Sequence, residues 1–92
     1  MKKRERTEII YDILKVICDR GGKAKPTHIL YKSNLSTQML NDYLDFLIEK
    51  GFIEKQHDKK NNKFYSIMDK GYKYIEDYSM IKKFMDSYDL ND

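Results

Sequence analysis

The sequence has one cysteine in 92 residues and no long hydrophobic run. Because Cys18 stands alone, a disulfide within the chain is impossible and a cysteine-based zinc site is excluded in practice. No apolar stretch approaches the roughly 20 residues that a membrane-spanning helix needs. The basic N-terminus is not followed by an apolar secretory segment, since Glu8, Asp12 and Lys15 interrupt it. We therefore expect a single small intracellular domain.

The sequence also lacks the residue sets that catalysis requires. His28 and His57 are its two histidines, and neither has a nucleophile or an orienting carboxylate nearby in the chain. No glycine-rich phosphate loop is present, and the pair Gly21-Gly22 is better interpreted as a helix terminus. The sequence therefore predicts a protein that is not an enzyme and that needs no cofactor or metal.

Charge, in contrast, is abundant: 36 % of the residues are charged and the net charge is +3. Residues 1–25 contain eight Lys or Arg against four Asp or Glu, and residues 51–70 contain five against three. A basic N-terminal arm together with a basic middle segment is a pattern expected of a protein that binds a polyanion. A solvated charged surface explains the same composition, so charge alone leaves both interpretations open.

Apolar spacing predicts a first helix that ends at Gly21-Gly22. Residues 23–25 are expected to be an extended connector, and Pro26 suits the first turn of a short second helix that reaches about Lys32. The apolar stripe of the first helix consists of Ile9, Ile10, Ile13, Leu14 and Ile17.

A turn and a third helix follow. Asn34 is a candidate turn residue because it tolerates positive φ. Ser36 is a suitable N-cap for a helix that runs to about Lys50. Two helices joined by a three-residue turn form a helix-turn-helix.

Residues 52–56 and 63–67 are predicted to be strands joined by the polar loop 58–62, which indicates a β-hairpin. A hairpin directly after a helix-turn-helix is the wing of a winged helix. The expected fold is therefore mainly α with a small β-hairpin: a winged helix-turn-helix with a long C-terminal helix.

The last helix is expected to run from about residue 68 to 88. It has apolar residues spaced 4, 3, 4 and 3 apart, which is a heptad pattern of the kind found in coiled coils. A helix of about 20 residues spans about 30 Å, more than a domain of this size needs for its own core. We therefore predict a winged-helix domain at 1–68 and a dimerisation helix at 69–92, although a helix that folds back on its own domain remains the alternative. The predicted interface residues are Tyr74, Tyr78, Ile81, Met85 and Tyr88.

Three sequence blocks, at residues 6–14, 29–36 and 43–54, together with the pair Lys70-Gly71, resemble a family of small archaeal winged-helix proteins. These blocks read RTEIIYDIL, ILYKSNLS and YLDFLIEKGFIE. Members of that family include ten-kilodalton DNA-binding proteins of Sulfolobus and relatives in viruses of such hosts. The resemblance implies a winged-helix domain, a homodimer through a C-terminal antiparallel coiled coil, and DNA binding.

In a winged helix the third helix enters the major groove of DNA. Asn and Gln can pair with adenine there, and Thr can contact a thymine methyl group. Asp42 and Asp45 would repel phosphates, so we expect the acidic half of the helix to tilt away from the groove or to accept from cytosine amino groups. The predicted base contacts are Ser36, Thr37, Gln38 and Asn41.

Phosphate contacts are expected from three further regions. Such contacts position a protein on DNA without reading its sequence. We therefore expect mainly electrostatic binding of double-stranded DNA, by a transcription regulator or a chromatin-type architectural protein in the cytoplasm of an archaeal or virus-infected cell. The alternative is a dimeric module that binds proteins and not DNA. The predicted residues are Lys2, Lys3, Arg4 and Arg6 in the arm, Lys32, Ser33 and Asn34 at the turn, and Lys55, Lys59, Lys60 and Lys63 on the wing.

Overall fold

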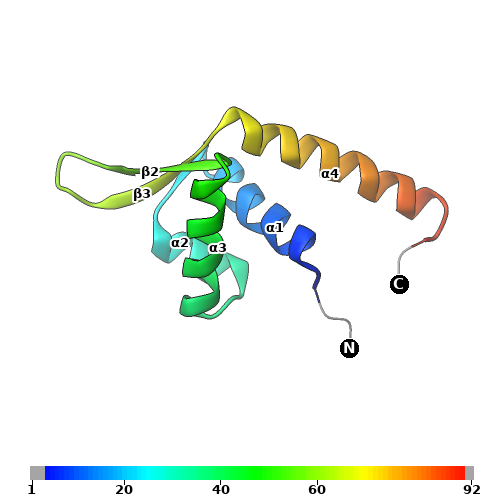
Figure 1. Ribbon diagram of the computed structural model, residues 1–92, viewed down its shortest axis with the longest axis horizontal. Helices are drawn as coiled ribbons and strands as arrows, with labels where there is room; N and C mark the ends of the chain where they lie inside the picture. The colour runs from blue at the N-terminus through cyan, green and yellow to red at the C-terminus, as the bar shows by residue number, and fades with distance from the viewer. Residues whose placement is uncertain (1–3, 91–92) are drawn as a thin grey trace.

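The computed structural model describes residues 4–90, in which four helices and three strands follow one another along the chain (Figure 1). The first three helices pack together, the β-hairpin extends to one side of them, and the last helix extends to the other. The predicted winged-helix arrangement is confirmed. The elements are α1 (Arg6–Asp19), β1 (Lys23–Ala24), α2 (Pro26–Ser33), α3 (Thr37–Glu49), β2 (Ile53–His57), β3 (Lys63–Ile67) and α4 (Asp69–Ser87).

The core lies between α1, α2, α3 and the base of the hairpin. All five residues of the predicted stripe on α1 are buried, and Ile13, Leu14 and Ile17 are completely inaccessible. Ile29 from α2 and Leu47 from α3 pack into the same cluster. The spacing of apolar residues thus identified the buried side of each of these helices, as expected when one stripe faces the core.

The sheet has three antiparallel strands in the order β1-β3-β2. Sequence analysis predicted the two long strands and treated residues 23–25 as a connector, whereas Lys23 and Ala24 pair with Ser66 and Tyr65 of β3. Two residues are too few to show an alternating pattern, so β1 has no sequence signature of its own. Its pairing fixes the end of α1 against the base of the wing.

The turn between α2 and α3 has the predicted turn residue and the predicted helix cap. Asn34 lies in the left-handed region at φ 58° and ψ 38°, which Asn tolerates better than most residues. Ser36 caps α3, because its hydroxyl oxygen accepts a hydrogen bond of 3.1 Å from the backbone N–H of Met39.

Helix α4 is fixed to the domain at its first turn. The Nζ atom of Lys70 donates a 2.7 Å hydrogen bond to the carbonyl of Lys50 and lies 4.7 Å from the ring centroid of Phe52. Gly71 is buried, and a Cβ at this position would lie 2.6 Å from the carbonyl oxygen of Phe52 and 2.7 Å from Cγ1 of Ile67. The pair Lys70-Gly71 therefore determines how closely α4 approaches the turn between α3 and β2.

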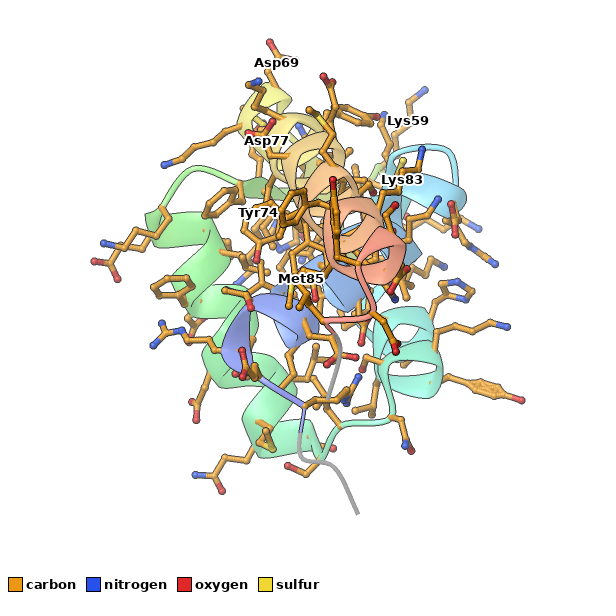
Figure 2. All side chains as sticks on the ribbon, turned by 90° about the vertical axis from the view of Figure 1, so that its right-hand side faces the viewer. Lys59, Asp69, Tyr74, Asp77, Lys83 and Met85 are labelled. Atoms are coloured by element: carbon orange, nitrogen blue, oxygen red, sulfur yellow. The ribbon has the colours of Figure 1, made fainter. Side chains whose placement is uncertain are left out.

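The next two turns of α4 pack on α1. The hydroxyl of Tyr74 donates to the carbonyl of Thr7 at 2.7 Å, and the ring of Tyr78 stacks on Tyr11 at a centroid distance of 4.7 Å. Figure 2 shows Tyr74 and Met85 on the side of α4 that faces α1. Among residues 4–90, no helix has both the length and the apolar composition that crossing a membrane requires.

Candidate nucleic-acid interface

The first turns of α3 present polar side chains to solvent. Thr37, Gln38 and Asn41 are all exposed, as predicted, while Leu40 on the opposite side of the helix is buried. Asp42 and Asp45 are exposed as well, so the N-terminal end of α3 is neutral and its second half is acidic. This arrangement brings together the predicted base-contacting residues on one accessible helix end.

The register of the hairpin determines which wing residues share a face. Lys55 of β2 is paired with Tyr65 of β3, and His57 is paired with Lys63. Paired residues in antiparallel strands point to the same side of the sheet, and that side also carries the buried Tyr65. We call it the inner face. Two of the predicted wing lysines, Lys55 and Lys63, therefore lie on the inner face.

The inner face adjoins α3. Burial raises the pKa of Tyr65, and the negative charge of Asp45 raises it further, so the charge of this α3 carboxylate reaches the tyrosine that is paired with Lys55. The acidic half of α3 and the basic inner face of the wing are thus neighbours. On this side of the domain lysine charge therefore offsets aspartate charge.

The tip of the wing is an ordered turn. The Asp58 carboxylate accepts hydrogen bonds from the backbone N–H groups of Lys60, at 2.9 Å, and Asn62, at 2.8 Å. The bond from Asn62 is the main reason that the pKa of Asp58 is lowered. Lys59 and Lys60 are exposed on this turn, so the carboxylate holds the backbone in a shape that presents both lysines to solvent.

The two arginines of the predicted arm make contacts within the chain. Arg4 forms a 2.7 Å ion pair with Asp12 and donates a 3.1 Å hydrogen bond to the carbonyl of Ser33. The guanidinium of Arg6 lies 4.3 Å from the ring centroid of Phe46, on α3. Arg4 therefore joins α1 to the end of α2, with its charge largely balanced by Asp12. The other predicted arm residues, Lys2 and Lys3, lie outside the described residues.

The three predicted residues at the turn are placed differently from one another. Ser33 is only 2 % exposed, and its hydroxyl points to the carbonyl of Leu30. Asn34 is exposed. Lys32 is exposed on the side of α2 that faces the end of α1, where it lines a hollow together with Arg20. Only Asn34 of this group thus combines an exposed side chain with a position in the turn itself.

The predicted dimer residues of α4 fall into two groups. Tyr74 and Tyr78 contact α1 of the same chain, as described above, and Met85 is half-buried. Ile81 and Tyr88 are exposed, by 57 % and 67 % respectively. Met80 and Phe84, which the heptad pattern did not include, are also exposed in this half of the helix, and Leu90 is exposed just beyond its end.

A second basic cluster is not evident from the sequence. Arg20, Lys23 and Lys25 contribute to the basic excess of residues 1–25, which the sequence pattern attributes to the N-terminal arm. The structure brings these three side chains together around Phe64 of β3. Three cations within six residues could have indicated this cluster. Its position beside Phe64 could not be predicted, because it depends on the pairing of residues 23–24 with β3.

A helix-turn-helix followed by a β-hairpin, with a short third strand paired to the hairpin, defines a winged-helix protein. The sequence profile described as winged helix-turn-helix matches residues 3–86. The chain belongs to this family.

One curated relative is an uncharacterised protein of Methanocaldococcus jannaschii. It is 40 % identical over 57 residues, which are 62 % of this chain and 57 % of the relative. The match thus spans little more than half the length of that protein.

Solved structures show the same fold. Sso10a-2, a DNA-binding protein from Sulfolobus solfataricus, is 27 % identical with a TM-score of 0.74, over 95 % of this chain and 90 % of that one. A winged-helix DNA-binding protein from STIV is 24 % identical with a TM-score of 0.71, over 88 % and 92 % of the two chains. MepR, a transcription regulator of the Staphylococcus aureus multidrug efflux pump MepA, is 16 % identical with a TM-score of 0.78, over 89 % and 62 %.

Proposed function

We propose that this protein binds double-stranded DNA through α3 and the inner face of the wing, as a transcription regulator or a chromatin-type architectural protein. The observation that carries the proposal is the neutral, exposed N-terminal end of α3, on a helix whose acidic second half adjoins a hairpin face with Lys55 and Lys63. The described DNA binding of Sso10a-2, which aligns along almost the whole chain, supports the same conclusion. Residues Ser36 to Asn41 enter the major groove, and the wing lysines contact phosphates.

Phosphate contacts provide most of the binding energy in this mode. No Arg or Lys lies on the exposed face of α3 before Lys50, so the bidentate contact from arginine to guanine is not made by this helix. Arg4 contributes less than sequence analysis expected because Asp12 neutralises it. The resulting preference is for A·T-containing sites, and it is modest.

The dependence of duplex binding on salt tests the proposal. With four to six phosphates neutralised per protomer, the logarithm of the association constant falls against the logarithm of salt concentration with a slope of about −4 to −5, at roughly 0.9 per phosphate. Gel shifts or fluorescence anisotropy with a random-sequence duplex at several salt concentrations measure this slope. A slope near zero, or no binding at low salt, contradicts the proposal and leaves the protein-binding module as the interpretation.

Replacement of Gln38 and Asn41 by alanine tests the base contacts. Each bidentate contact distinguishes a correct base from a wrong one by about 1–3 kcal/mol, so the double variant is expected to lose its preference for selected over random duplex. Its salt slope stays unchanged because neither residue is charged. Selection of sites from a random DNA pool, followed by competition binding, gives the measurement, and Glu49→Ala at the far end of α3 is the control.

We further propose that the protein is a homodimer through the C-terminal half of α4. Two protomers that cover Ile81, Phe84 and Tyr88 remove exposed apolar side chains at the end of this helix from water, which is favourable at about 25 cal/mol per Å² of apolar surface. The intramolecular contacts of Tyr74 and Tyr78 restrict the interface to the turns beyond them. In this arrangement α4 has two roles, packing on α1 at its start and pairing with a second copy at its end.

Charged substitutions on α4 test the dimer. The double variant Ile81→Glu/Phe84→Glu is expected to be a folded monomer, because both side chains are exposed in the single chain and a dimer would bury four carboxylates. Light scattering coupled to size exclusion gives the mass, and circular dichroism reports folding. Glu76→Lys/Asp77→Lys, which changes charge on an earlier turn of the same helix, is the control. If Ile81→Glu/Phe84→Glu has the mass of a dimer, the interface lies elsewhere.

A further inference from the structure

The outer face of the sheet, opposite to the inner face, carries a second basic surface. Phe64 and Ser66 alternate along β3 with the inward-pointing Tyr65 and therefore point outward. Lys23 of β1 is paired with Ser66 and lies on the same side. The hydroxyl of Ser66 donates to the side-chain carbonyl of Gln56 at 2.8 Å, which ties the two strands together beneath this surface. A straight duplex held by α3 and the inner face cannot reach it, because the sheet lies between.

A hollow of about 370 Å³ lies on this outer side, and we call it the outer groove. It is lined by Arg20, Lys23, Ala24, Lys25 and Phe64. Among the described residues that line it there are three cations, one aromatic ring and no carboxylate. The Nζ atom of Lys23 lies 5.7 Å from the ring centroid of Phe64. Carboxylates also lie near the lining: Glu54 of β2 is paired with Ser66 and is exposed on the same outer face. The Asp58 carboxylate is within electrostatic reach of Lys25 but is engaged by the turn of the wing.

A second hollow of about 340 Å³ adjoins the outer groove, and the two share Arg20. Its other lining residues are Val16, Asp19, His28 and Lys32. The carboxylate of Asp19 is paired with Lys15 at 2.8 Å, so its charge is compensated. The pKa of His28 is lowered by desolvation and then by the charges of Arg20 and Lys32. The potential between the end of α1 and the start of α2 is therefore positive.

We propose that the outer groove binds nucleotide units of single-stranded nucleic acid, with phosphates held by Arg20, Lys23 and Lys25 and a base stacked on Phe64. Open basic grooves with an aromatic platform bind single strands in this way, because every base has a face that can stack. In a duplex both faces of each base are already covered, so a duplex cannot use Phe64. The adjoining hollow at His28 and Lys32 accepts the next nucleotide. This site is separate from the proposed duplex interface and does not depend on it.

Fluorescence anisotropy with labelled hexathymidylate tests the proposal, in the presence of saturating unlabelled duplex that occupies α3 and the inner face. The labelled strand is expected to bind the duplex-loaded protein. Phe64→Leu, which keeps an apolar side chain, weakens this binding about tenfold through the loss of stacking. Arg20→Ala/Lys23→Ala, which changes two exposed side chains, weakens it and reduces the salt slope by about 1 to 2. The charge-matched variant Lys82→Ala/Lys83→Ala leaves it within about twofold, because these exposed lysines lie on α4 and not in the outer groove.

A single strand and a free nucleotide both carry a base and a phosphate, and a titration with adenosine monophosphate distinguishes between these two ligands. Backbone amide shifts of Lys23, Ala24 and Phe64 on titration locate either ligand. Tighter binding of hexathymidylate than of the mononucleotide supports a single strand, whereas equal or weaker binding overturns it in favour of a free nucleotide. The proposal is also overturned if duplex displaces the labelled strand, or if both outer-groove variants bind it as the unmodified protein does. None of these results bears on duplex binding by α3.

Discussion

Replacement of Gly71 by alanine is expected to destabilise the protein by about 2 kcal/mol, and replacement by valine by more. The added Cβ would lie 2.6 Å from the backbone carbonyl of Phe52 and 2.7 Å from a side-chain carbon of the buried Ile67. Overpacking of this kind costs typically 1–3 kcal/mol. Neither neighbour can move freely, since one is backbone and the other belongs to the core. Alanine favours the helix by up to about 1 kcal/mol over glycine, which offsets part of the cost.

The measurement is urea or thermal unfolding followed by circular dichroism. A loss of about 2 kcal/mol lowers the Tm of a domain this size by about 10 °C. Glu76→Ala, at an exposed position of the same helix, is the control and is expected to stay within about 0.5 kcal/mol of the unmodified protein. Unchanged or increased stability of Gly71→Ala would show that helix propensity outweighs the close approach of α4 to the turn before β2.

Loss of the inner-face lysines is expected to have the largest effect on duplex binding. At about 0.1 M salt, release of 0.9 counterions per contact corresponds to about eightfold in affinity, so Lys55→Ala/Lys63→Ala weakens binding by about sixtyfold. All duplex sequences are affected alike, because phosphate contacts do not read bases. The salt slope becomes shallower by about 2.

A variant that loses two lysines elsewhere distinguishes the effect of the position of the inner-face lysines from the effect of the net charge of the protein. Lys23→Ala/Lys25→Ala removes the same two charges from the outer side of the sheet, near β1. It is expected to retain duplex affinity within a few-fold and an almost unchanged salt slope, both measured by the same anisotropy titrations. Equal losses in the two variants would mean that the duplex responds to total charge and not to the inner face.

Local patterns in the sequence predicted most of the fold. The stripe on α1, the Ser36 cap and the turn at Asn34 each depend on neighbours within one turn of chain, and all three are confirmed. The pair Lys70-Gly71, which resembles the pattern of small archaeal winged-helix proteins, has a structural role because it sets the contact between α4 and the turn from Lys50 to Phe52.

Contacts between distant segments could not be predicted in the same way. The pairing of β1 with β3 joins residues about 40 positions apart, and it creates the outer groove. The sequence does not indicate whether Arg4 pairs with a carboxylate of the chain or with a phosphate, and in the structure it pairs with Asp12. Tyr74 and Tyr78 fit a heptad, but a heptad pattern does not distinguish a partner helix from α1 of the same chain.

The attachment of α4 has a mechanical consequence. Lys70, Tyr74 and Tyr78 hold this helix to the domain at three successive turns, so the direction of the helix is fixed relative to the domain. The molecule is 49 Å long in its longest dimension. In a dimer joined at the far ends of α4, the two copies of α3 are held at a fixed separation and angle, and a DNA turn is about 34–36 Å. Binding of such a dimer to two sites depends on whether both sites face the same side of the duplex. Adding about five base pairs between them, half of a 10.5-base-pair turn, rotates one site to the far side of the duplex.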